Sequence, residues 1–182
     1  MSTRKDVRSG LIYELLGEMM APIEEKFQSG IMERGHMVEE VVKDTYYQWI
    51  ESVWFCRRTD IPYIGISPDV VVIKKNRFVR ALEVKGPAPK QMMKCWLSPS
   101  IPEEYFWQVV HYFVVFDDLE TLDFVACSPD MYDEYFRKRT ITVTREELQE
   151  SIDLAKEALE EFHEEFLAIA ETCINLKPKY LE

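Results

Sequence analysis

The 182-residue chain lacks the sequence features of secreted and membrane proteins. Its four cysteines are scattered without a CxxC pair, so we expect free, buried thiols in a reducing compartment. It has no apolar run of about 18 residues, and its N-terminal stretch has no apolar signal core, so we expect a soluble intracellular protein with no membrane association. Glycine is scarce, with six residues, whereas 47% of the chain is hydrophobic, which is typical of a folded globular protein.

An excess of positive charge is also absent, because the formal net charge is −11. Such a charge opposes a general affinity for DNA phosphates. The charge is uneven, however: residues 144–182 are rich in glutamate, and the central part of the chain is basic. The central basic residues are Lys74, Lys75, Arg77, Arg80, Lys85, Lys90 and Lys94. This distribution is compatible with a nucleic-acid site that is confined to one cleft.

The order of the expected elements favours an α/β (α+β) fold, in which a mixed central sheet is flanked by helices. Helices are expected over residues 5–27, 36–54, 103–116 and 148–173, and strands over about 69–74, 78–85, 121–127 and 137–143. Pro22 is expected to end or bend the first helix. Thr144 and Glu147 form a capping box before the last helix. The proline-rich stretch 86–102 is expected to be an irregular loop.

The two central strands carry two carboxylates and an ammonium group. Side chains alternate along a strand, so Glu83 and Lys85 share one face, and Asp69 on the neighbouring strand can lie beside them. Hard cations such as Mg²⁺ and Mn²⁺ bind carboxylate oxygens, polarise a phosphodiester and lower the pKa of bound water. Lys85 would orient that water or stabilise developing negative charge. A structural Glu83–Lys85 ion pair is the alternative that the pattern leaves open.

Four motifs in order resemble those of the PD-(D/E)XK nuclease superfamily, and more narrowly its lambda-type exonuclease, or YqaJ-like viral recombinase, group. They are RGxxxE (Arg34, Gly35, Glu39), the SPD that ends at Asp69, the LEVK of residues 82–85, and QVxHY from Gln108 to Tyr112. The resemblance covers about residues 30–170. It implies a single domain with a restriction-endonuclease-like core at 31–170, an N-terminal helix within 1–30 and a tail at 171–182.

The resemblance also implies the roles of the site residues. The implied metal ligands are Asp69, Glu83, Glu39 and the Val84 backbone carbonyl. Lys85 would assist the attacking water, and Gln108 would help to hold the lysine or the substrate. The residues expected to contact DNA are Arg34, Tyr112, Lys90, Lys94 and Trp96, although Trp96 fits ordinary packing equally well.

The implied activity is that of a Mg²⁺-dependent exonuclease, with Mn²⁺ as a substitute, that acts from the 5′ ends of linear duplex DNA. It would serve phage or prophage recombination in the cytoplasm of a bacterial host, with a single-strand annealing protein as partner. Lambda-type enzymes form ring-shaped trimers, so a homo-oligomer is implied. No iron–sulfur cluster is expected, because only Cys173 lies near the C-terminus, where related cluster-bearing nucleases place several cysteines.

The sequence departs from the family pattern at two places, and the motifs leave two other functions open. Val110 stands where relatives often have a second glutamine, and the N-terminal region is shorter than in the phage exonuclease. The alternatives are a structure- or single-strand-specific endonuclease of the same superfamily and a non-catalytic module that binds DNA ends or protein.

Overall fold

The computed structural model describes residues 5–21, 35, 37–40, 42, 55–58, 60 and 64–175. Arg34, Pro22 and most of the helix expected at 36–54 lie outside the described residues. The chain forms two compact units, one of residues 1–27 with 153–182 and the other of residues 28–152. The expected single domain, with its boundaries at 30 and 170, stays a prediction.

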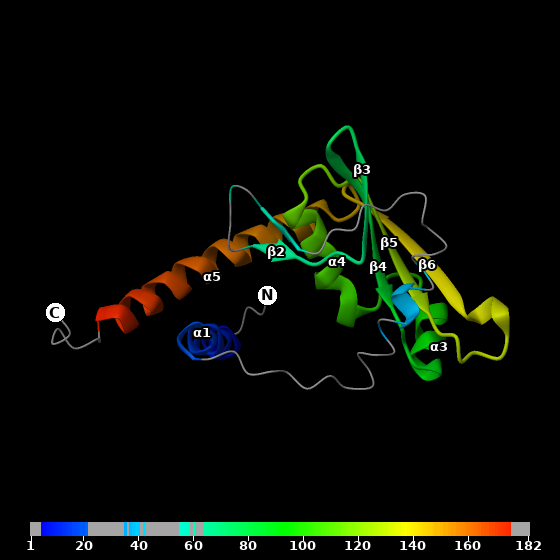
Figure 1. The fold of residues 1–182 in the computed structure, drawn as a ribbon, viewed down its shortest axis with the longest axis horizontal. Helices are drawn as coiled ribbons and strands as arrows, with labels where there is room; N and C mark the ends of the chain where they lie inside the picture. Colours follow the sequence, from blue (N-terminus) through cyan, green and yellow to red (C-terminus); the bar gives the residue numbers. More distant parts are fainter. Residues whose placement is uncertain are drawn as a thin grey trace. The chain divides into compact units, whose positions relative to one another are not determined.

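A four-stranded mixed sheet forms the centre of the larger unit (Figure 1). Its strands, in spatial order, are β3 (Val70–Lys74), β4 (Arg77–Lys85), β5 (Thr121–Cys127) and β6 (Lys138–Thr144). β4 runs antiparallel to β3 and parallel to β5, and β6 runs antiparallel to β5. All four strands match the expected ones to within a residue or two. The fold class is therefore confirmed as a mixed central sheet flanked by helices.

The turn of the central hairpin lies between the two strands expected at 69–74 and 78–85. Lys75 and Asn76 both have positive φ angles, 50° and 63°. Two consecutive residues of positive φ give a backbone twist that matches the twist of the flanking strands, and asparagine tolerates this conformation well. The turn thereby fixes the pairing of β3 with β4, and with it the position of Asp69 relative to Glu83.

The crossover from β4 to β5 contains two helices, and one of them was not expected. The stretch 86–102, expected as a loop, contains helix α3 (Pro89–Leu97), so that prediction was wrong. Pro89 occupies the start of the helix, where a missing N–H costs no hydrogen bond. Met92 and Cys95, three residues apart, are both buried on one side of it. The prolines of this segment flank the helix and do not interrupt it.

Helix α4 (Glu103–Val115) is the second helix of the crossover and was expected at 103–116. The ring of Tyr105 packs on Phe124 of β5, with their centroids 5.4 Å apart, so α4 lies over the face of the sheet that carries Phe124. The opposite face is covered by an apolar cluster made of Val38, Val42, Val70, Leu82, Val84, Val125 and Cys127. Both faces of the sheet are therefore covered.

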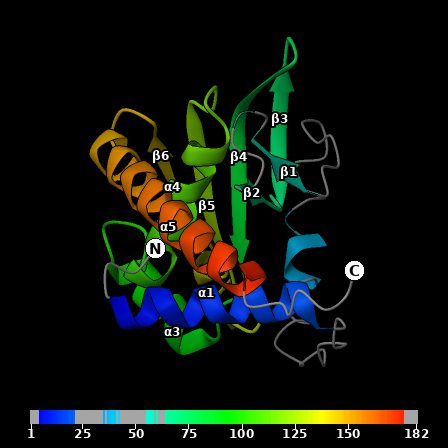
Figure 2. The same ribbon diagram turned by 90° about the vertical axis from the view of Figure 1, so that its left-hand side faces the viewer.

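The smaller unit consists of α1 (Lys5–Met20) and most of α5 (Gln149–Asn175), which pack against each other at an oblique angle (Figure 2). Ile12, Leu16 and Phe162 form its buried centre. Within the described residues, no helix is long and apolar enough to cross a membrane. Of the four free cysteines, Cys95 and Cys127 are buried and the other two are half-buried.

The predicted capping box is present before α5. The Thr144 N–H donates to the Glu147 carboxylate at 2.8 Å, and the Glu147 N–H donates to the Thr144 hydroxyl at 3.2 Å. The regular helix begins at Gln149, one residue later than expected. The box therefore closes the turn between β6 and α5 and satisfies its backbone donors.

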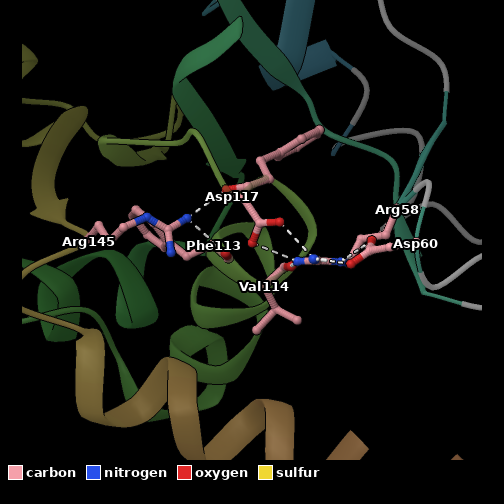
Figure 3. A network of polar contacts seen from close by, with 7 residues as sticks. Arg58, Asp60, Phe113, Val114, Asp117 and Arg145 are labelled. Carbon is pink, nitrogen blue, oxygen red and sulfur yellow. Dashed lines mark hydrogen bonds and ion pairs between the residues drawn. The ribbon is translucent and has the colours of Figure 1, made fainter.

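Arg145, in the same turn, caps the C-terminal end of α4 (Figure 3). Its guanidinium donates to the carbonyls of Phe113 at 2.9 Å, Phe116 at 2.6 Å and Leu119 at 2.9 Å. The last carbonyls of a helix have no partner within it, so they need donors from elsewhere. Burial lowers the pKa of Arg145.

Arg58 holds the same helix end from the opposite side (Figure 3). It follows β1 (Cys56–Arg57), which pairs with β2 (Gly65–Ile66). Arg58 donates to the Val114 carbonyl and makes bidentate contacts to Asp60 and Asp117 at 2.7–2.9 Å. These two carboxylates raise its pKa. Two arginines thus fix the end of the helix that carries Gln108 and Tyr112.

Replacing Arg145 should destabilise the larger unit. We expect Arg145→Ala to lower the free energy of unfolding by about 2–3 kcal/mol, because buried carbonyls lose a charged donor. Urea denaturation measures this change. Arg145→Lys should recover only part of it, since one ammonium group cannot serve three separate carbonyls at once. Equal stability of wild type and Arg145→Ala would contradict the capping role.

Candidate active site

Asp69 lies immediately before β3, and its carboxylate is tied to the neighbouring strand. Its Oδ2 accepts a hydrogen bond from the Val84 N–H at 2.7 Å. Its own N–H donates to the Tyr112 hydroxyl at 3.4 Å. Among the described residues, no hydrogen bond uses its second carboxylate oxygen. One oxygen of Asp69 is thus fixed by the protein, and the other is left for a further partner.

Glu83, in β4, is almost fully buried, with 2% of its surface exposed. Its Oε1 accepts from Gln108 Nε2 at 2.7 Å and pairs with the Lys85 ammonium. Its Oε2 accepts from the Tyr112 hydroxyl at 2.5 Å. A carboxylate offers about four lone-pair directions, so one remains after these three contacts.

Lys85 lies between the carboxylate and an aromatic ring. Its ammonium pairs with Glu83, two residues before it on the same strand face, and lies 5.5 Å from the centroid of the Tyr105 ring. A cation over an aromatic face is attracted by the quadrupole of the ring. Tyr105 was missed in the sequence interpretation. Its spacing of three residues from Gln108 could have revealed it, since residues i and i+3 share a helix face.

The electrostatics of the site show an excess of negative charge. The pKa of Asp69 is raised to about 7, first by burial and then by the Glu83 carboxylate. Glu39 raises it further, whereas the Val84 N–H and Lys85 lower it. Burial and the two carboxylates also raise the pKa of Tyr112 well above its usual value, so its hydroxyl stays a neutral donor. One ammonium group does not compensate two carboxylates that are held this close.

The donor set fits a hard divalent cation. Mg²⁺ is commonly held by one or two carboxylates, with waters and substrate phosphates as the other ligands. Asp69 and Glu83 supply two carboxylates, and a cation beside them would relieve the charge that raises the pKa of Asp69. Among the described residues, no group of three or more His, Cys, Asp or Glu side chains gathers to hold a metal. The roles of Glu39 and of the Val84 carbonyl as ligands stay predictions.

The residues expected to contact DNA occupy different environments. Lys90 and Lys94 are exposed on α3. Trp96 is half-buried, and its indole N–H donates to the Phe136 carbonyl at 3.1 Å. Tyr112 is fully buried, and its hydroxyl bonds to Glu83, so its position fits the support of that carboxylate. Arg34 lies outside the described residues, and the DNA-binding roles stay predictions.

One more buried carboxylate lies outside the site. Asp123 of β5 is 1% exposed, accepts from Arg80 Nε at 3.0 Å and accepts from the Thr142 hydroxyl at 2.7 Å. Its Cα partner on β4 is Leu82, so its side chain projects from the face opposite to Glu83. Asp123 thus links the three strands and does not belong to the group around Glu83.

The fold and this constellation define the class of protein. A mixed sheet, whose central hairpin carries an Asp and a Glu-x-Lys, is the arrangement expected of a PD-(D/E)XK nuclease core. The model of the YqaJ-like viral recombinase domain matches residues 2–121, so the chain belongs to this family. The resemblance predicted from the motifs is thereby confirmed.

Solved structures with the same fold include two of an alkaline exonuclease, LHK-Exo, from Laribacter hongkongensis. The complex of LHK-Exo with dAMP is 18% identical to the chain, with a TM-score of 0.71, and the alignment covers 97% of this chain and 88% of that one. A second structure of the enzyme gives the same identity and TM-score and is covered to 89%. No curated protein sequence matches the chain. The predicted class, a nuclease, agrees with this family and this fold.

The raised pKa of Asp69 predicts how the stability of the metal-free protein depends on pH. The folded state holds this proton up to about pH 7, whereas the unfolded state loses it near pH 3.9. The contribution of protonated Asp69 to the free energy of unfolding is therefore complete below about pH 4 and is lost as the pH rises to about 7. In EDTA, the unfolding free energy of wild type should fall between about pH 4 and 7 relative to that of Asp69→Asn. Parallel pH profiles of the two proteins would contradict this expectation.

Removing the hydroxyl should affect stability differently at the two tyrosines of α4, Tyr105 and Tyr112. Tyr112→Phe should lower the free energy of unfolding by about 1.5–3 kcal/mol, because the buried Glu83 carboxylate loses a donor. Tyr105→Phe should lower it much less, because its hydroxyl bonds to the exposed Glu104 carboxylate and its ring remains beside Lys85. Denaturant titrations of both variants measure the difference. Equal effects would show that the Tyr112 hydroxyl does not support Glu83.

Proposed function

We propose that the protein is a Mg²⁺-dependent DNA exonuclease that degrades linear duplex DNA from its 5′ ends. The observation that carries this proposal is the convergence of the Asp69 and Glu83 carboxylates beside the Lys85 ammonium. Two carboxylates with excess negative charge suit a divalent cation, and a nearby ammonium suits chemistry on a phosphodiester. The family and the shared fold support the choice of a nuclease.

Asp69 and Glu83 are the proposed metal ligands, with Glu39 and the Val84 carbonyl completing the set. Bound Mg²⁺, or Mn²⁺ in its place, would polarise the scissile phosphodiester and lower the pKa of the attacking water. The carboxylates must be ionised to bind it. An Asp69 pKa of about 7 in the metal-free protein therefore predicts tighter metal binding at alkaline pH.

Lys85 orients the attacking water and stabilises the negative charge that develops on the phosphate. Gln108 and Tyr112 hold Glu83 in place through both of its oxygens. The Tyr105 ring limits where the Lys85 ammonium can lie. The protein side chains thus fix the orientation of the reacting groups before the substrate arrives.

The solved neighbours support an exonuclease over other nuclease types. LHK-Exo is described as an alkaline exonuclease and has been solved with dAMP, a deoxynucleoside monophosphate. By analogy, we propose mononucleotides as the product of this chain and phage-type recombination in the cytoplasm of a bacterial host as its setting. A single-strand annealing protein is the proposed partner, and a ring-shaped trimer is the proposed assembly.

A digestion experiment tests the proposal. Linear duplex DNA, labelled at either the 5′ or the 3′ end, is incubated with Mg²⁺, and closed circular DNA serves as the control. We expect the 5′ label to be released as mononucleotide and the circle to stay intact. A cut circle would identify an endonuclease instead. An absence of cleavage in both Mg²⁺ and Mn²⁺ would favour a non-catalytic module that binds DNA ends or protein.

Lys85→Ala tests the catalytic role of the site. It should lower the cleavage rate by about 100- to 1,000-fold, because the ammonium acts on charge that develops in the transition state. Binding of DNA in EDTA should change little. Lys74→Ala, at an exposed lysine of the same hairpin, is the matched control and should cleave saturating DNA at the wild-type rate. Wild-type cleavage by Lys85→Ala would refute the assignment.

A further inference from the structure

A stack of aromatic rings, of which Tyr135 is exposed and Trp96 and Phe136 are half-buried, lies outside the group around Glu83. The ring of Trp96, in α3, stacks on Tyr135 with centroids 5.0 Å apart and meets the edge of Phe136 at 5.4 Å. Tyr135 and Phe136 belong to the short helix η2 (Glu134–Phe136). We call these three rings, together with the exposed Tyr132 three residues before Tyr135 in the sequence, the aromatic ledge.

Hydrogen bonds and ring contacts fix Trp96, Phe136 and the backbone of Tyr135. Trp96 donates its indole N–H to the Phe136 carbonyl at 3.1 Å, which ties α3 to η2. The Arg139 guanidinium lies 5.5 Å from the Trp96 ring centroid and donates to the carbonyls of Cys95, Trp96 and Ser98. The Tyr135 N–H is bonded to the Asp133 carboxylate at 2.9 Å. A ligand would therefore meet rings that are already ordered, which lowers the entropic cost of binding.

The outer side of the aromatic ledge is open. Tyr135 is 69% exposed and Tyr132 is 102% exposed, so both rings present apolar surface to solvent. One face of the Tyr135 ring packs on Trp96, and this contact explains why that face is apolar. The contact explains neither the exposure of the other face nor that of the Tyr132 ring. The sequence singled out Trp96 as a DNA contact, whereas the structure exposes Tyr135 at that place.

The charge around the aromatic ledge differs from that of the whole chain. Residues 89–97 and 128–139 together contain five basic and three acidic residues, whereas the whole chain has a net charge of −11. Lys90 and Lys94 are exposed, and 42% of the Arg137 side chain is exposed although it pairs with Glu134 at 3.4 Å. Exposed aromatic rings beside basic side chains are the combination that binds single-stranded nucleic acid, because bases stack on the rings and phosphates attract the cations.

The sheet register places the aromatic ledge near the proposed active site. Lys85 pairs with Ala126 on β5, and Ala126 pairs with Arg139 on β6. Paired residues project from the same face of a sheet, so the side chains of Lys85 and Arg139 lie on one face, and their backbones are about 10 Å apart at two strand spacings. A DNA strand that is bound near Glu83 can therefore reach the Trp96 ring, which Arg139 contacts, and the Tyr135 ring stacked on it.

We propose that the aromatic ledge binds single-stranded DNA, with a base stacked on Tyr135 and the phosphates contacted by Lys90, Lys94 and Arg137. The inference deepens the proposed function, because the bound strand would be one that passes the proposed active site. Stacking on a ring does not depend on base identity, so the site would accept any sequence.

A binding experiment in EDTA, where metal-dependent cleavage cannot occur, tests the proposal. The anisotropy of a fluorescein-labelled oligo(dT) reports the affinity of the full chain. Tyr135→Ala should weaken binding by about 5- to 150-fold, the range for loss of one base–aromatic stack. Tyr135→Phe should bind like wild type, because the ring is retained. Tyr13→Ala removes a tyrosine of similar exposure, 64%, from α1 and serves as the matched control, which should also bind like wild type.

A second variant keeps the test decisive if Tyr135→Ala fails to fold. Tyr132→Ala removes a fully exposed ring and should weaken binding by a smaller factor without changing the circular dichroism spectrum. Wild-type affinity in every folded alanine variant of Tyr135 and Tyr132 would overturn the proposal. The proposal would also be overturned if these variants kept wild-type affinity for DNA but lost self-association, because the rings would then form a contact between copies of the protein. Cleavage of linear duplex DNA by these variants is measured separately. The proposed DNA binding by the aromatic ledge and the proposed nuclease activity can therefore be refuted independently of each other.

Discussion

The buried carboxylate of Glu83 is the group on which the arrangement of the larger unit depends. Burying a charge is costly unless it is paired and hydrogen-bonded, so both of its oxygens need partners from nearby elements. Lys85 comes from the same strand, whereas Gln108 and Tyr112 come from α4. Helix α4 must therefore present one particular side to the sheet. The same contacts would place this carboxylate beside Asp69 for a metal ion.

The rest of the larger unit restrains that helix. Arg58 and Arg145 cap its C-terminal carbonyls from two separate turns, and His111 bonds the Gly65 carbonyl of β2 at 3.1 Å. Each contact joins residues that lie far apart in the sequence, so each forms only when the chain has folded. A rotation of α4 would break the caps and withdraw the donors from Glu83 together. Stability and the geometry of the site are thus coupled through one helix.

The distribution of charge explains how an acidic chain can act on DNA. Ten of the 33 acidic residues lie in α5 and the turn before it, beside only two basic residues, whereas basic residues gather on the central hairpin, α3 and the start of β6. Phosphates are attracted over about a Debye length, so the local charge of a surface decides binding more than the net charge does. The aromatic ledge lies within this basic region and adds a surface on which bases can stack.

The sequence by itself determined the strands, the hairpin turn and the family, because alternating apolar residues and the Asp, Glu-x-Lys and Gln-x-x-x-Tyr motifs are local patterns. It also placed Glu83 beside Lys85, since the period of a strand fixes which side chains share a face. Only the tertiary structure decided that residues 89–97 are a helix, that Tyr105 lies beside Lys85, and that Tyr135 covers Trp96. These features depend on packing between segments distant in the sequence, and no local periodicity records which segments meet.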